Sequence, residues 1–174
     1  HSFPTRRSAD LTFTGGGSSA LNDEMLKAES LMDIGHYREA ADRYGVAALL
    51  DPINPLPLIG RGHALLATGD YRSAALTLMH GLERFPDIAH FSIDLKSLMG
   101  SGEVIDIRRA DILERLGQRE SVELRFLLGY LEYHTGDHAR GLADLDRAAR
   151  DPRASMIIAR YPTLLRQRES APAP

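Results

Sequence analysis

The chain has 174 residues, of which 43% are apolar and 26% are charged, and its formal net charge is -3. These values are typical of one globular domain, and the weak net charge gives no global field that would attract nucleic acid or an acidic membrane. The absence of cysteine excludes disulfides, thiolate nucleophiles and cysteine metal sites. No apolar run approaches the roughly 20 residues of a membrane-spanning helix, and no signal peptide is visible.

The first twenty residues are predicted to lie outside the fold. Residues 1–11, HSFPTRRSADL, resemble a translated sequencing adapter, and their adjacent arginines and early proline show no amphipathic spacing. Residues 12–20 are rich in Gly and Ser, which is typical of a flexible linker. We therefore expect an artefactual or disordered leader over residues 1–20. Upstream sequence, including the true N-terminus and any signal peptide, is expected to be missing, so the compartment is unknown, with the cytoplasm as the default.

A 34-residue period begins at residue 21. Two aligned segments start at Gly35 and Gly69, and a third copy starts at Gly136. A small residue stands seven positions before each of these glycines, namely Ala28, Gly62 and Gly129. Further residues of the first two segments match at an offset of 34: Tyr37/Tyr71, Ala40/Ala74, Tyr44/Leu78, Ala47/Gly81 and Pro52/Pro86. Between these markers apolar residues recur at spacings of three and four, which predicts helices rather than strands.

Each marker has a physical role in a helical hairpin. Glycine between two helices tolerates a positive φ without a Cβ clash, and proline ends the second helix. The small residues allow the two helices to approach closely. Leucine at Gly62 should overpack that contact, whereas alanine is expected to be mild because it is the better helix former.

This spacing resembles the tetratricopeptide repeat, a 34-residue helix–turn–helix unit. The resemblance implies an all-α solenoid of about four helical hairpins, spanning residues 21–168. The expected repeats cover residues 21–54, 55–88, 89–121 and 122–154. The third repeat is degenerate, because Arg108 and Arg115 stand where small residues should be. Short capping helices separated by Pro162 are expected over residues 155–168, followed by a disordered tail over residues 169–174.

The resemblance also implies a binding role, because partner contacts in this family come from the inner, concave face of the first helices. Carried over by repeat position, the groove residues are Met25, Glu29, Met32, Ile59, His63, Leu66, Phe126, Tyr130 and Tyr133. Their mostly apolar character favours a helix or an extended apolar peptide. Met25 and Glu29 stand where carboxylate-clamping members carry lysine and asparagine, so a chaperone-type role is not expected.

The segment 122–134, VELRFLLGYLEYH, is apolar nearly all round, and two arrangements account for it. Capping helices enclose it completely, as is normal for such a helix. Alternatively, its aromatic side chains line the groove, with Tyr130 and Tyr133 partly exposed and their hydroxyls hydrated.

No pattern predicts a catalytic, cofactor or metal site. His134 and His138 have the spacing of a zinc-binding pair, but Thr135 and Gly136 place a turn between them. The arginines of residues 147–168 are expected to form a solvated helix face, since no aromatic pattern there suggests stacking of nucleic-acid bases. The leading hypothesis is a non-catalytic scaffold for a protein or peptide partner. The alternatives are an accessory module of a larger enzyme whose catalytic part is missing, and a self-associating structural repeat.

Overall fold

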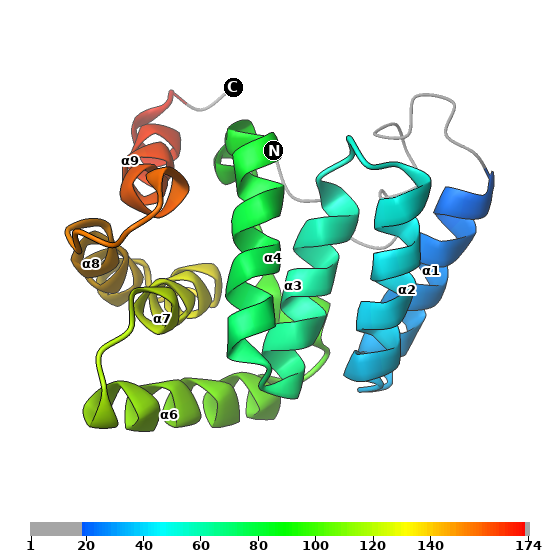
Figure 1. The fold of residues 1–174 in the computed structure, drawn as a ribbon, viewed down its shortest axis with the longest axis horizontal. Helices are drawn as coiled ribbons and strands as arrows, with labels where there is room; N and C mark the ends of the chain where they lie inside the picture. Colours follow the sequence, from blue (N-terminus) through cyan, green and yellow to red (C-terminus); the bar gives the residue numbers. More distant parts are fainter. Residues whose placement is uncertain (1–18, 173–174) are drawn as a thin grey trace.

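The computed structural model describes residues 19–172, and the regular elements of this range are helices (Figure 1). In chain order they are α1 (Ser19–Asp33), α2 (Tyr37–Leu50), α3 (Leu56–Thr68), α4 (Tyr71–Arg84), the 3-10 helix η1 (Pro86–His90), α5 (Leu95–Met99), α6 (Gly102–Gln118), α7 (Val122–His134), α8 (His138–Ala149) and α9 (Met156–Ser170). The prediction of an all-α fold is confirmed. The predicted leader lies outside the described residues except for Ser19 and Ala20, which already belong to α1.

Three pairs of consecutive helices pack as hairpins, α1/α2, α3/α4 and α7/α8. Each pair turns at one of the repeat glycines, and the φ angles of Gly35, Gly69 and Gly136 are 78°, 83° and 109°. A side chain on Cβ would strain this left-handed backbone, which explains glycine at all three turns. The second helices α4 and α8 are then started by Asp70 and Asp137, whose carboxylates accept hydrogen bonds from backbone N–H groups of the first turn.

The small residues before the turns mark where the two helices of a hairpin touch. A Cβ atom on Gly62 would lie 2.5 Å from Cγ of Leu78. At the equivalent position of the α7/α8 hairpin, a Cβ on Gly129 would lie 2.7 Å from the backbone nitrogen of Leu145 and 2.8 Å from the carbonyl oxygen of Gly141. In these two hairpins a Cβ at the glycine position would therefore force neighbouring atoms to move.

Residues 89–121 differ from the three hairpins. The two helices expected there are present but unequal, a five-residue α5 and a seventeen-residue α6. In Figure 1, α6 lies crosswise below α3 and α4 instead of continuing their stack. Arg108 donates through Nε to the carbonyl oxygen of Ala67 (2.9 Å), and the guanidinium of Arg115 lies 5.0 Å from the ring centre of Tyr71. The arginines that interrupt the repeat pattern thus attach α6 to the α3/α4 hairpin.

The C-terminal segment is one helix, not the two short capping helices expected from the sequence. Pro162 lies inside α9 and is buried. Proline removes one backbone hydrogen bond, but Ile158, Tyr161 and Leu165 bury their side chains on both sides of it, which outweighs that loss. The helix extends to Ser170, so residues 169 and 170, predicted to belong to a disordered tail, are helical. Residues 173–174 of that predicted tail lie outside the described residues.

We predict that Gly62→Ala destabilises the protein by about 1–3 kcal/mol, because Leu78 and α4 must shift to admit the added methyl group. This corrects the sequence-based expectation of a mild effect. Gly117→Ala in α6 is the matched control, since a Cβ there meets nothing within 4 Å and alanine is the better helix former. Urea unfolding of both variants checks the prediction. Equal stability of the two variants would contradict the close contact.

Candidate functional site

The inner face of the first two hairpins, predicted to be a binding groove, is filled by the chain itself. The short helix α5 packs against α1, α3 and α7, and the hydroxyl of Tyr37 donates to the carbonyl oxygen of Met99 (2.7 Å). Seven of the nine predicted groove residues are consequently buried, with exposed fractions of 3% or less: Met32, Ile59, His63, Leu66, Phe126, Tyr130 and Tyr133. Only Met25 and Glu29 are half-buried. The predicted groove is therefore part of the core.

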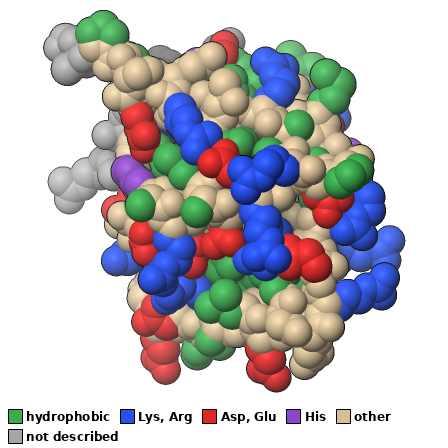
Figure 2. Space-filling view, turned by 90° about the vertical axis from the view of Figure 1, so that its left-hand side faces the viewer, with side chains coloured by type: hydrophobic (Ala, Val, Ile, Leu, Met, Phe, Trp, Pro, Cys, Tyr) green, Lys and Arg blue, Asp and Glu red, His purple; other side chains and the backbone are tan. Residues whose placement is uncertain are grey.

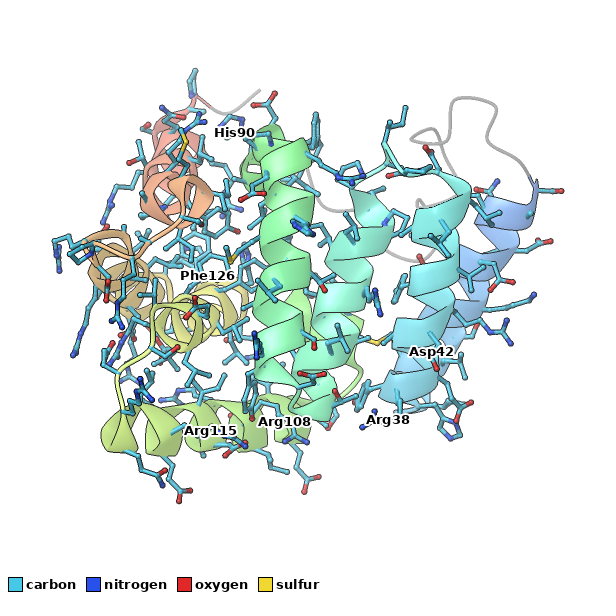
Figure 3. All side chains as sticks on the ribbon, in the orientation of Figure 1. Arg38, Asp42, His90, Arg108, Arg115 and Phe126 are labelled. Carbon is cyan, nitrogen blue, oxygen red and sulfur yellow. The ribbon has the colours of Figure 1, made fainter. Side chains whose placement is uncertain are left out.

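Helix α7 is enclosed by its neighbours, so the first of the two alternatives for residues 122–134 is confirmed. Tyr130 and Tyr133 are 0% and 1% exposed, so the second alternative, in which they are partly exposed in a groove, does not occur. The rings of Phe126 and Tyr130 lie 5.8 Å and 5.9 Å from the ring of Tyr161 on α9. Figure 3 labels Phe126 among the side chains between α7 and the surrounding helices. Contacts with α4, α6 and α8 cover the other sides of α7.

Two buried histidine–tyrosine pairs tie these helices together. Nε2 of His63 lies 2.7 Å from the hydroxyl oxygen of Tyr130, and Nε2 of His134 lies 2.7 Å from that of Tyr161. Burial lowers the pKa of His63 to about 3 and holds the pKa of His134 well below its ordinary value. Both imidazoles are therefore neutral at pH 7. These hydrogen bonds join α3 to α7 and α7 to α9 inside the core, where they satisfy polar groups.

A charged network that the sequence did not reveal lies between α6, α7 and α8. Glu132 is buried, its Oε1 accepts from Nε of Arg109 (3.3 Å), and its Oε2 has no partner. Burial first, and then the nearby carboxylate of Asp144, raises the pKa of Glu132 to about 7, against the opposing effect of Arg109. Arg125 donates to Glu120 and to Asp144, each at 2.8 Å. In the sequence, Arg125 and Glu132 are only polar positions within the otherwise apolar segment 122–134, and nothing connects them with Arg109, Glu120 or Asp144.

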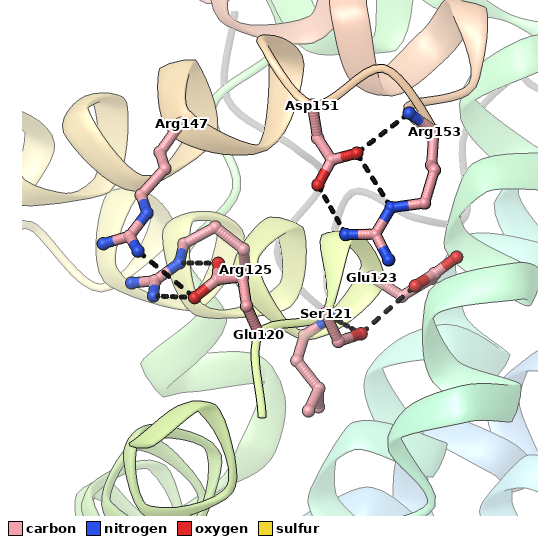
Figure 4. Close-up of polar contacts among 8 residues, drawn as sticks. Glu120, Ser121, Glu123, Arg125, Arg147, Asp151 and Arg153 are labelled. Carbon is pink, nitrogen blue, oxygen red and sulfur yellow. Dashed lines mark hydrogen bonds and ion pairs between the residues drawn. The ribbon is translucent and has the colours of Figure 1, made fainter. Parts of the chain in front are cut away.

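Three of the six arginines of residues 147–168 pair with acidic side chains. Figure 2 looks onto this end of the molecule and shows acidic groups between the basic ones. Arg147 pairs with Glu120, Arg153 with Asp151 and Arg166 with Asp146, as Figure 4 draws for the first two pairs. Within residues 19–172 no group of three or more His, Asp or Glu side chains could hold a metal ion. None of the helices in this range combines the length and apolarity needed to cross a bilayer.

The described surface has an apolar groove between α1 and α2, on the side of the hairpin that faces away from α3. We call it the outer groove. Its volume is about 550 Å³, and it is lined by Leu26, Lys27, Ser30, Leu31, Glu39, Asp42, Arg43 and Val46. Leu26 and Val46 are 48% and 42% exposed, and the stripe of α2 continues to Leu50 and Ile53, which are 47% and 86% exposed. Exposed apolar stripes of this kind mark interaction surfaces.

The repeat explains the form of the outer groove. An offset of 34 residues places Leu26 at Gly60 and Leu31 at Leu65 of α3. On α3 this face is covered by α2, since a Cβ on Gly60 would lie 2.5 Å from the ring of Tyr44. The outer groove therefore corresponds to the face of α3 that α2 covers, but in the first hairpin no described residue covers this face.

A second cleft of about 570 Å³ lies between α4, α6 and α7. Most of its charged groups already have partners. Asp70 caps α4, Arg115 donates to Asp111 (3.2 Å), and Glu123 accepts from the hydroxyl of Ser121 (3.1 Å). Because its polar groups are satisfied within the chain, this cleft offers a ligand less than the outer groove does.

Comparisons with protein-family models, with curated proteins and with solved structures gave no match.

We predict that Glu132→Gln stabilises the protein at pH 8.5 and has a smaller effect at pH 5. The folded-state pKa of Glu132, about 7, lies above the ordinary glutamate value of 4.5, so the folded state holds the proton more tightly than the unfolded state does. The stability of the wild type relative to the variant must then fall as the pH rises from about 4.5 through 7. Thermal melts at both pH values check this, with the exposed Glu114→Gln as control. A stabilisation that does not depend on pH would contradict the raised pKa.

Proposed function

We propose that this chain is a non-catalytic protein-binding module, and that it binds an amphipathic helix in the outer groove. One observation carries the proposal. The face of α1 that lines the groove corresponds, at an offset of 34 residues, to the face of α3 that α2 covers. Helix α2 buries Tyr44 on that face, so the geometry of the repeat already accepts a helix there. A helix laid along α1 and α2 would cover Leu26, Leu31 and Val46 and remove their apolar surface from water.

The inner face supports the same proposal by leaving a partner little to contact. Its apolar side chains, Ile59, Leu66 and Phe126 among them, are already covered by the chain. A partner at that face would first have to displace residues 95–99, of which Leu95 and Met99 are 0% exposed. The outer groove requires no such rearrangement, because its lining is open to water.

A displayed library of random amphipathic helical peptides tests this proposal. We expect selected peptides to carry apolar residues at positions i, i+3, i+4 and i+7. Val46→Arg should weaken their binding by about 2 kcal/mol or more, the usual scale of a central contact.

Leu113→Arg is the matched control, because Leu113 on α6 is 45% exposed, close to the 42% of Val46. Peptides that bind Val46→Arg as well as the wild type, or a library that yields no helical binder, would contradict the proposal.

A further inference from the structure

The two ends of the molecule carry opposite charge. The α1/α2 hairpin, residues 19–54, contains seven acidic and three basic residues, whereas residues 138–170 contain seven arginines and four acidic residues. Figure 1 places α1 and α9 at opposite ends of the fold. A surface at one end is therefore free to contact the other end of a second molecule, and such a contact would bring acidic and basic surfaces together.

At the acidic end, the charges of the outer groove leave one carboxylate without a partner. Lys27 and Arg43 both point to Glu24, with N–O distances of 2.9 Å and 3.4 Å. Asp42, labelled on α2 in Figure 3, makes no ion pair or hydrogen bond with another residue of the described range. The groove thus presents an apolar floor with an unpaired negative charge at its side.

At the basic end, α9 presents an exposed stripe of the complementary kind. Met156, Ala159, Arg160, Thr163 and Gln167 are all exposed and follow one another at helical spacings. Met156 is 79% exposed although its side chain is large and apolar. The guanidinium group of Arg160 makes no ion pair or hydrogen bond with another residue of the range 19–172. The stripe therefore combines one large apolar side chain, one free cation and two small residues.

The small residues of this stripe match a feature of the outer groove. Tyr44 fits on α3 because Gly60 leaves room for its ring. The groove has Leu26 at the corresponding place, so its occupant must carry a small residue there to approach as closely. Ala159 and Thr163 meet this requirement.

We infer that α9 of a second copy of this chain occupies the outer groove, with Met156 against Leu31 and Val46 and with Arg160 beside Asp42. The inference rests on the proposed function, because it names the helix that the groove binds. The two surfaces are different and lie at opposite ends, so the contact is heterologous. Copies joined in this way add further copies beyond a pair, as an open chain or as a ring.

Sedimentation of the full chain over micromolar to millimolar concentrations tests the inference. The weight-average mass should rise beyond that of a dimer, because each bound copy still presents one free surface at either end of the pair. Asp42→Arg and Arg160→Glu should each weaken the association by about tenfold or more, since either change places like charges together. Mixing the two variants should restore association, because unlike charges then meet at every contact between one variant and the other.

Asp106→Arg is the control, with the same charge change at an exposed position of α6, and it should leave the association unchanged. A monomer at every concentration, a plateau at the dimer, or association that is indifferent to Asp42→Arg would each overturn the inference. If helical peptides still bind the groove of a strictly monomeric protein, the proposed function stands and its partner is a different helix. If neither association nor peptide binding occurs, both proposals fail.

Discussion

The fold depends on the passage of the chain across the inner face of its first two hairpins. Between α4 and α6 the chain buries Ile88, Ile93, Leu95 and Met99, and Tyr37 binds the backbone at Met99. This crossing fills the face on which a helical solenoid would hold a partner. It also directs α6 across the ends of α3 and α4, and it positions α7 to be covered on every side. The outer groove remains open to water among the described residues.

The parts of the fold that the sequence predicted are those encoded within one repeat. A glycine with positive φ, a small residue seven positions before it and apolar residues at helical spacing are local signals. Gly69 and Gly62 act in the structure as expected, at the turn and at the closest approach of α3 and α4. The hairpins at α1/α2, α3/α4 and α7/α8 follow from these signals alone.

The parts that the sequence did not predict depend on contacts between residues far apart in the chain. His63 and Tyr130 are separated by 67 positions. Both were predicted to line one groove, but nothing in either segment indicates a buried hydrogen bond between them. Arg108 is a second example of a distant contact. In the sequence it only interrupts the pattern of small residues, whereas in the structure it donates a hydrogen bond to the carbonyl oxygen of Ala67. At Pro162 the sequence predicted a helix break, because proline lacks a backbone N–H group. The helix continues there because the neighbouring side chains are buried. The outer groove had a sequence signal, since Leu26 replaces the small Gly60 of the next repeat.

The central claim is that the inner face is permanently filled and therefore leaves partner binding to the outer groove. Hydrogen exchange at the amide of Leu98 tests it most directly. This amide donates to the carbonyl oxygen of Asp94 (3.1 Å) within the segment that covers the inner face. If the segment belongs to the core, Leu98 should exchange only through global unfolding, as slowly as the core amide of Leu78 in α4. Exchange at Leu98 that is much faster than at Leu78 would show that the segment opens by itself, and would contradict the account.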